Sequence, residues 1–222
     1  GSFPAGAIAW RISDEPFMQN TKNWLYNLKL RASIGTSGAD NIDPSLWTST
    51  WKNSTIKVDG KDVTTYVPGD QMANPDLKWE TTISRNIGLD FGFFDNKLYG
   101  SVEFYWNTTK DLLMKVPFSA ATGYSYQTQN VGQTSNKGIE LSLGAEILRT
   151  KDWSLSMNAT YNYNKNNVDK LAEGVLVDAR AAGKWGSSMA VPAYDYIVKE
   201  GSPVGCIYGF KSIGYYTTED FT

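Results

Sequence analysis

Five aromatic side chains in loop-like segments are the residues of this sequence best suited to bind a ligand. Flat rings can stack on the faces of sugars, and aromatic residues are also enriched where proteins meet one another. We therefore expect these rings either to contact a ligand or partner, or to pack the loops together. They are Trp47, Trp51, Tyr124, Tyr126 and Trp185.

Catalytic chemistry has weaker support in the sequence. Several acidic and basic side chains fall inside alternating segments: Glu103, Glu140, Glu146, Lys29 and Arg31. Paired carboxylates could in principle act as acid and base, but a water-facing side of a sheet explains the same residues more simply. The chain has no histidine and one cysteine, Cys206, which excludes Ser–His and Cys–His pairs and the common zinc ligand sets. We predict no catalytic residue, metal site or cofactor, and Cys206 as a small filler in a loop.

The charge balance indicates no nucleic-acid partner. The 222 residues include 21 basic and 23 acidic side chains, a formal net charge of -2, and the basic residues are scattered along the chain. A phosphate-binding surface needs them clustered. No run of about 18 apolar residues predicts a transmembrane helix.

Strict alternation of apolar and polar side chains is the main structural signal. From Thr81 to Phe93 the odd positions are mostly apolar and the even positions polar or glycine, a period of two that is typical of a β-strand. Several such runs reach ten residues or more, whereas ordinary soluble strands have about five or six. That length suits a tilted strand that crosses a membrane. We predict strands at about 3–12, 24–35, 79–94, 97–109, 137–148, 152–165 and 207–216.

The connections alternate between short and long. Tight turns are expected at 95–96 and 149–151, and long loops at 36–78, 110–136 and 166–206, with a small hairpin at 58–61. Outer-membrane barrels have short turns on the periplasmic side and long loops outside. The sequence therefore predicts an antiparallel meander with its turns at one end and its loops at the other.

The alternation also assigns side chains to faces. We predict that Leu89, Phe91, Leu141, Leu143, Leu155 and Met157 face outward to lipid, and that Asn86, Asp90, Glu140, Ser156 and Asn158 face inward. Arg85 interrupts the apolar face and is expected near the outer rim. An interfacial aromatic belt is predicted from Trp153, Tyr161, Tyr163, Tyr105 and Trp106.

Six or seven strands of this length cannot close a barrel, so we expect residues 1–222 to be part of a larger one. A different possibility is a soluble all-β carbohydrate-binding module. In that protein the apolar faces would meet a second sheet instead of lipid.

Several strings resemble TonB-dependent outer-membrane transporters of the SusC/RagA family. They occur in the family's order across nearly the whole chain: Leu28–Gly38, Asn74–Thr82, Asn86–Gly92, Gly100–Tyr105, Asn130–Leu141, Glu200–Gly205 and Tyr208–Lys211.

The resemblance implies an all-β fold, an antiparallel meander within a 22-stranded transmembrane barrel of the outer membrane of a Gram-negative, Bacteroidetes-type bacterium. It also implies import of oligosaccharides or peptides together with a SusD-like surface lipoprotein, with no enzymatic activity. The TonB complex would act through an N-terminal part, because no counterpart of the TonB box or plug occurs in this sequence.

Overall fold

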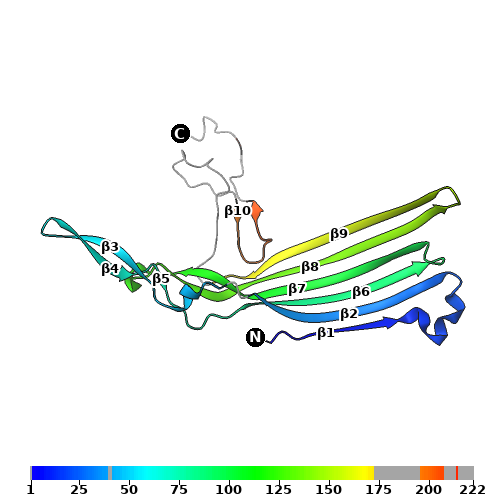
Figure 1. Cartoon of the computed structure of the whole chain (residues 1–222), viewed down its shortest axis with the longest axis horizontal. Coiled ribbons are helices and arrows are strands. Elements are labelled where there is room, and N and C mark those ends of the chain that lie inside the picture. Colours follow the sequence, from blue (N-terminus) through cyan, green and yellow to red (C-terminus); the bar gives the residue numbers. More distant parts are fainter. Residues whose placement is uncertain (1, 40–41, 173–195, 208–213, 215–222) are drawn as a thin grey trace.

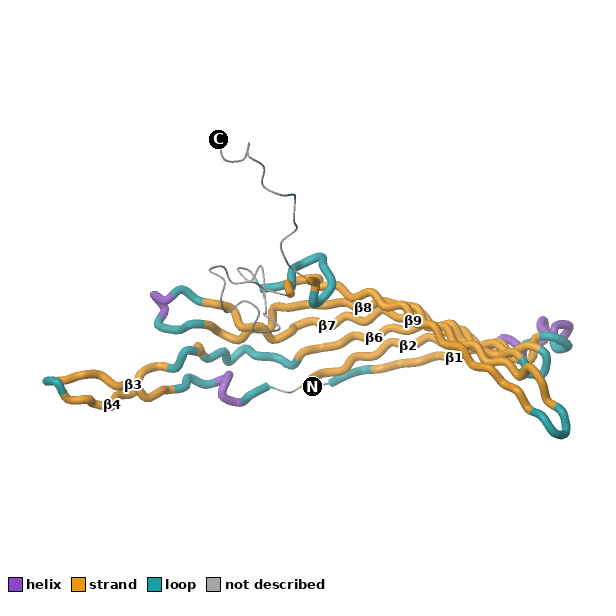
Figure 2. The backbone as a smooth tube through the Cα atoms, turned by 90° about the horizontal axis from the view of Figure 1, so that it is seen from above, coloured by secondary structure: helices purple, strands orange, loops and turns teal. Residues whose placement is uncertain are grey.

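An antiparallel sheet dominates the computed structural model, which describes residues 2–39, 42–172, 196–207 and 214 (Figure 1). Its main strands are β1 (Ala5–Arg11), β2 (Leu25–Ala39), β6 (Glu80–Phe93), β7 (Leu98–Pro117), β8 (Tyr126–Arg149) and β9 (Ser154–Lys170). Each pairs antiparallel with the next in sequence order, so the predicted meander is confirmed. The strands lie side by side and twist along their length (Figure 2).

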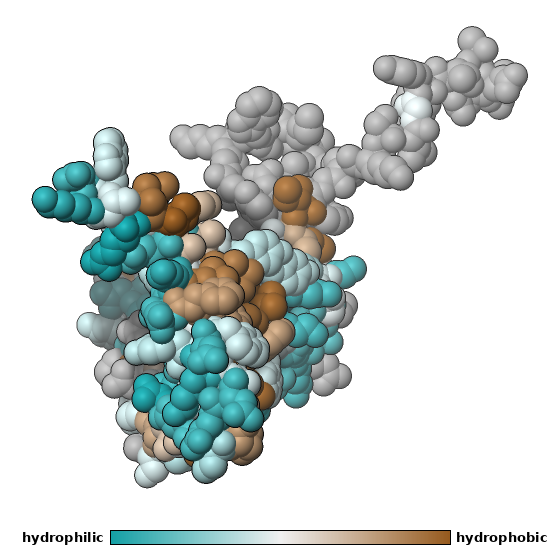
Figure 3. All heavy atoms as spheres, turned by 90° about the vertical axis from the view of Figure 1, so that its right-hand side faces the viewer, coloured by the Kyte–Doolittle hydropathy of each residue, from teal (hydrophilic) through white to brown (hydrophobic). Residues whose placement is uncertain are grey.

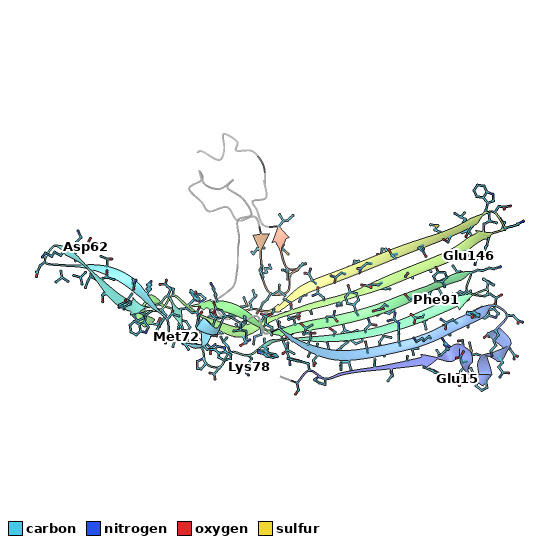
Figure 4. The ribbon with its side chains drawn as sticks, in the orientation of Figure 1. Glu15, Asp62, Met72, Lys78, Phe91 and Glu146 are labelled. Atoms are coloured by element: carbon cyan, nitrogen blue, oxygen red, sulfur yellow. The ribbon has the colours of Figure 1, made fainter. Side chains whose placement is uncertain are left out.

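One end of the sheet carries the short connections, called here the turn end. The 3₁₀ turns η1 (Ile12–Asp14) and η2 (Pro16–Thr21) join β1 to β2 there. The β6–β7 turn lies beside them, because the Phe94 N–H donates to the Trp24 carbonyl at 2.9 Å. The β8–β9 turn is next, since the Glu146 N–H donates to the Lys97 carbonyl at 2.7 Å. Glu15 and Glu146 mark this end in Figure 4.

The opposite end, called here the loop end, carries the long connections. It holds η3 (Pro44–Trp47), β3 (Trp51–Val58), β4 (Lys61–Pro68), β5 (Gln71–Met72) and η4 (Ala120–Thr122). Met72 and Lys78 lie here, and Asp62 lies at the tip of a hairpin that projects beyond the sheet (Figure 4). The predicted separation of turns from long loops is therefore confirmed for 36–78 and 110–136, whereas 173–195 of the third predicted loop lie outside the described residues.

The projecting hairpin is the one predicted at 58–61. β3 and β4 pair antiparallel from Trp51–Pro68 to Val58–Lys61. Asp59 (φ 50°) and Gly60 (φ 75°) both adopt the left-handed region, which an Asp-Gly pair tolerates and which a two-residue hairpin turn requires.

The predicted loops are wrong in extent because strands continue into them. β2 continues to Ala39, β7 to Pro117 and β9 to Lys170, and β8 begins at Tyr126, so segments 36–78, 110–136 and 166–206 are partly strand. β5 also adds a short parallel pairing with β8, Gln71 opposite Tyr126. These continued parts lack the regular alternation of apolar and polar side chains that marks a half-buried strand, so the alternation did not reveal them.

The last predicted strand, 207–216, is described only at residues 207 and 214. Residues 206–207 form β11 (Cys206–Ile207), which pairs with β10 (Tyr196–Ile197). Cys206 is therefore at the start of a strand and not in a loop. The residue is half-buried, and its Sγ lies 3.3 Å from the Pro203 carbonyl oxygen. The remainder of the predicted strand lies outside the described residues.

The register sorts side chains onto two faces, because directly paired residues project from the same side of a sheet. The apolar face carries rows such as Leu30, Leu89, Val102, Leu141 and Tyr161. The polar face carries rows such as Lys29, Asp90, Ser101, Ser142 and Thr160. The predicted division between the two sets of side chains is confirmed.

Burial on these faces is the reverse of that in a water-soluble protein. Ile8, Phe104 and Met157 on the apolar face are 77%, 51% and 60% exposed, whereas the Glu103 side chain on the polar face is only 24% exposed. Seen from the turn end, hydrophobic side chains lie at the surface among hydrophilic ones (Figure 3). In the described part of the chain no second sheet packs on the apolar face, as a soluble module would require. No helix among the described residues is long and apolar enough to cross a membrane.

Candidate functional site

The loop end is the candidate functional site, and side-chain amides fasten its segments to the sheet. The Asn130 side chain on β8 bonds both backbone groups of Lys78: its Oδ1 accepts from the N–H and its Nδ2 donates to the carbonyl, each at 2.8 Å. The same Nδ2 donates to the Asp111 carbonyl at 2.7 Å. One amide thus joins the segment that precedes β6 to a bulge in β7.

Asn74 makes a second connection. Its Nδ2 donates to the Thr128 carbonyl at 2.8 Å, and its backbone N–H donates to the Leu46 carbonyl at 3.0 Å. Gln127 completes the attachment by donating to the Ala73 carbonyl at 2.8 Å. η3, and with it Trp47, is therefore held against β8.

Asp70 makes the third connection, at the base of the projecting hairpin. Its carboxylate accepts from Lys52 Nζ at 2.5 Å, and its carbonyl accepts from the Ser125 N–H at 2.7 Å. The Gly69 N–H donates to the Thr50 carbonyl at 2.7 Å and closes the base of the hairpin. The β3–β4 hairpin is thereby tied to the tip of the β7–β8 hairpin.

Two predicted site residues are exposed on this framework. Trp47 ends η3 and is 53% exposed, and Trp51 begins β3 and is 66% exposed. Asp43 caps η3 by accepting from the Ser45 N–H at 2.8 Å, and this hydrogen bond lowers the pKa of the Asp43 carboxyl.

The other predicted aromatics differ in their surroundings. Tyr126 is half-buried, and the Lys115 ammonium lies 4.6 Å from its ring centroid, a cation–π distance. Tyr124 is half-buried in the β7–β8 tip, where its N–H donates to Thr122 Oγ1 at 3.3 Å. Trp185 lies outside the described residues.

The polar face carries an ion cluster that spans three strands. Arg31 on β2 donates from Nε to Asp90 at 3.1 Å and from its terminal nitrogen to Glu103 on β7 at 2.7 Å. It reaches across β6 because Gly88 leaves room: a Cβ there would lie 2.8 Å from the guanidinium carbon. Asn86 donates to the second oxygen of Glu103.

This arrangement favours a structural role for the acids over a catalytic one. Both oxygens of Glu103 are engaged, and Glu140, directly opposite in register, accepts from Asn162 at 3.0 Å. Glu146 instead pairs with Arg149 near the turn end at 3.1 Å. No group of three or more potential metal ligands gathers among the described residues.

Tyr105 is misplaced in the predicted belt. It pairs with Asn86 and Gly138 and so lies on the polar face, where its ring covers Gly138. Trp106, Tyr161 and Tyr163 do lie on the apolar face. The prediction is wrong for Tyr105 because this side chain has another role. A tyrosine over a glycine fills the gap that the missing side chain leaves in a sheet.

Asn74 and Asn130 lie within the family-like strings, but their residue types predicted no role for them. The feature that could have identified them is their position, because each lies just before a strand that the alternation predicted. The string Glu200–Gly205 has a comparable role: Glu200 accepts from the Leu171 N–H at 2.6 Å, and the Val168 and Ser202 backbones bond at 2.9 Å. These strings attach the long segments to the sheet.

Loss of the Asn130 amide should loosen the loop end. In the full-length protein, Asn130→Ala removes three hydrogen bonds, each worth about 0.5–1.5 kcal/mol net. Amide hydrogen exchange at Lys78 should accelerate about tenfold or more. Asn136→Ala is the matched control, since Asn136 lies on the same strand without a side-chain hydrogen bond among the described residues. Unchanged protection at Lys78 would contradict the attachment.

An apolar outward face, a polar inward face and loops gathered at one end define a wall segment of an outer-membrane β-barrel. The chain belongs to the family of TonB-dependent receptor-like β-barrels, whose model matches residues 1–198. Barrels of this family are outer-membrane proteins of Gram-negative bacteria.

Known relatives agree in sequence and structure. TonB-dependent receptor P3 of Formosa agariphila is 34% identical over 99% of this chain and 21% of its own length. TonB-dependent receptor SusC of Bacteroides thetaiotaomicron is 36% identical over 78% of this chain and 18% of its own length. The RagAB peptide importer in its open-open state superposes with a TM-score of 0.75 at 30% identity, over 92% of this chain and 20% of that one. The chain thus spans about a fifth of the length of these relatives.

Proposed function

We propose that this chain forms part of the wall and outer vestibule of an importer for oligosaccharides or peptides. The observation that carries the proposal is the pair of exposed tryptophans, Trp47 and Trp51, on a loop end held in place by hydrogen bonds. Loops on a rigid scaffold are where binding specificity commonly resides. The likeness to a structure described as a peptide importer supports peptide as one cargo class.

A SusD-like surface lipoprotein is the proposed outer partner, and the TonB complex the proposed source of energy through a part of the protein beyond this sequence. The β3–β4 hairpin supports an outer partner because it projects beyond the sheet and exposes Tyr66 (69%) and Trp51 (66%) (Figure 1). Aromatic residues are enriched at protein interfaces. We also propose that the chain has no enzymatic activity, which fits the absence of histidine from its sequence.

Uptake by the full-length transporter tests the proposal. Trp47→Ala, Trp51→Ala and Trp185→Ala should each lower cargo capture or lipoprotein affinity about threefold to tenfold, since one aromatic contact is worth about 1 kcal/mol. Barrel assembly should be unaffected, because Trp47 and Trp51 lie outside the main sheet. The measurement is uptake of labelled oligosaccharide and labelled peptide, with lipoprotein binding measured in parallel.

Trp153→Ala is the matched control, because Trp153 is 74% exposed but lies at the turn end. Wild-type uptake and lipoprotein binding in all three loop variants would assign these rings to loop packing and remove the support for the vestibule. Turnover of a glycan or ester by the purified protein would overturn the proposed lack of enzymatic activity.

A further inference from the structure

A row of basic side chains crosses the apolar face near the loop end. Arg85 on β6, Lys137 on β8 and Lys165 on β9 share one row of the register with Ile34 and Trp106. Lys137 and Lys165 are exposed and Arg85 is half-buried. This row is called the basic row below.

The basic row lacks acidic partners. Among the described residues, none of Arg85, Lys137 or Lys165 has a carboxylate oxygen within 4.0 Å. The nearest acid along β9, Asp169, lies at a register shift between β8 and β9 and accepts from neutral Ser135 (2.8 Å), Asn167 (2.7 Å) and Gln133 (3.2 Å). Lys110, in register with Gln133, adds a further cation toward the loop end. The outward surface is therefore cationic at this level.

The level of the row matches a membrane boundary. The apolar face of β6 extends over eight residue steps, from Arg85 to Phe93, on which Trp24 stacks at 5.9 Å. At about 3.4 Å per residue and a tilt of about 40°, this corresponds to roughly 21 Å of depth, close to the apolar band of about 25 Å in such barrels. The basic row thus lies where the outer-leaflet headgroups begin.

An apolar hollow adjoins the row on the hydrocarbon side. It has a volume of about 470 Å³. Gly6 and Ala32 leave room for it because they are small where the neighbouring strands carry larger side chains. The larger side chains around it include Ile8, Ile34, Ile87, Trp106 and Arg85. A phosphate beside Arg85 could therefore place an attached acyl chain in the hollow.

We propose that the basic row and this hollow bind one phosphate-bearing, acylated lipid of the outer leaflet. The phosphate lies among the Arg85, Lys137 and Lys165 cations, and one acyl chain lies along Ile8, Ile34 and Ile87. The proposal rests on the family's outer-membrane location but not on the cargo or on the proposed import function. Charge complementarity selects an anionic lipid, because three cations without a carboxylate partner among the described residues attract an anionic headgroup and repel a cationic one.

The test uses the full-length protein, purified in detergent and freed of native lipid. The probes are lipid A with one phosphate and the same lipid after enzymatic removal of the phosphate, with binding measured by native mass spectrometry. Each cation near an anionic headgroup contributes about fivefold in affinity. Arg85→Gln/Lys137→Gln/Lys165→Gln should therefore bind the phosphorylated probe at least about tenfold more weakly than wild type.

Matched controls separate the site from general charge. Lys29→Gln/Lys57→Gln/Lys61→Gln removes the same number of charges from the polar face and the projecting hairpin, and should bind as wild type does. Lys165→Gln alone, at an exposed position, should weaken binding about threefold to fivefold and keeps the test valid if the triple variant does not fold. Ala32→Leu fills the hollow and should weaken binding severalfold while leaving every cation in place.

Several results would overturn the proposal. These are wild-type affinity in the triple variant or in Lys165→Gln, equal binding of the dephosphorylated probe, and unchanged binding in Ala32→Leu. Displacement of the lipid by inorganic phosphate at the same concentration would instead identify a free-anion site and would also overturn it.

Discussion

Arginine in place of Leu141 is expected to destabilise the full-length barrel in a bilayer by about 2–4 kcal/mol, the cost of a cation at mid-depth on a lipid face. Leu141 lies in the middle of the apolar face, in register with Val102 and Tyr161. Urea unfolding in lipid vesicles measures the loss.

The adjacent residue provides a control with the same substitution. Ser142 lies on the opposite face, in register with Ser101 and Thr160, in the row that also holds Lys29 and Asp90. Ser142→Arg should change stability by less than about 1 kcal/mol, because an exposed polar position tolerates charge. Equal losses in both variants would disprove the assignment of the two faces.

A methyl group at Gly138 is the second change with a large expected effect. A Cβ there would collide with the Tyr163 carbonyl oxygen on β9 and lie 2.5 Å from the Tyr105 hydroxyl. The backbone at Tyr163 cannot move aside without breaking the β8–β9 pairing. Gly138→Ala in the full-length protein should therefore lower the free energy of unfolding by about 1–3 kcal/mol. Denaturant titration in detergent checks this.

Two further variants identify the cause. Tyr105→Ala combined with Gly138→Ala removes the contact with the ring but not that with the backbone, so it should restore little of the lost stability. Gly6→Ala is the matched control, since a Cβ there meets nothing within 4 Å. Its effect should be neutral or slightly stabilising. Full recovery of stability in the double variant would show that the contact with the Tyr105 ring, and not the contact with the β9 backbone, causes the loss.

Alternation predicted the membrane-facing part of the sheet well, for a physical reason. Between lipid and a wet interior each strand must present apolar and polar side chains in turn. The polarity of a single residue, such as Leu89 or Asp90, Leu141 or Ser142, therefore indicates the face on which it lies. The order of the strands joined by short turns also followed, because such turns make neighbours in sequence pair, as β6 and β7 do.

The outer halves of β7 and β8 could not be found in this way. Asp111 adopts a left-handed φ of 59° in a bulge that shifts the register, so any alternation is interrupted at the predicted strand end. Beyond it, Gln127, Gln129 and Asn130 place polar side chains on both faces of the strand, so this part of the sequence resembles a loop. The candidate aromatics were found from residue type alone, whereas the Asn74 and Asn130 attachments depend on contacts 50 or more residues apart.

The backbone hydrogen bonds at the loop end also bear on the thermodynamics of recognition. A flexible loop loses about 1–2 kcal/mol of conformational entropy for each residue that a ligand orders. Here the backbone around Trp47 and Trp51 is already fixed through Leu46–Asn74, Thr50–Gly69 and Asp70–Ser125 before any ligand arrives. Docking on these rings would then retain most of its gross interaction energy, so such a receptor can be selective without a large contact area.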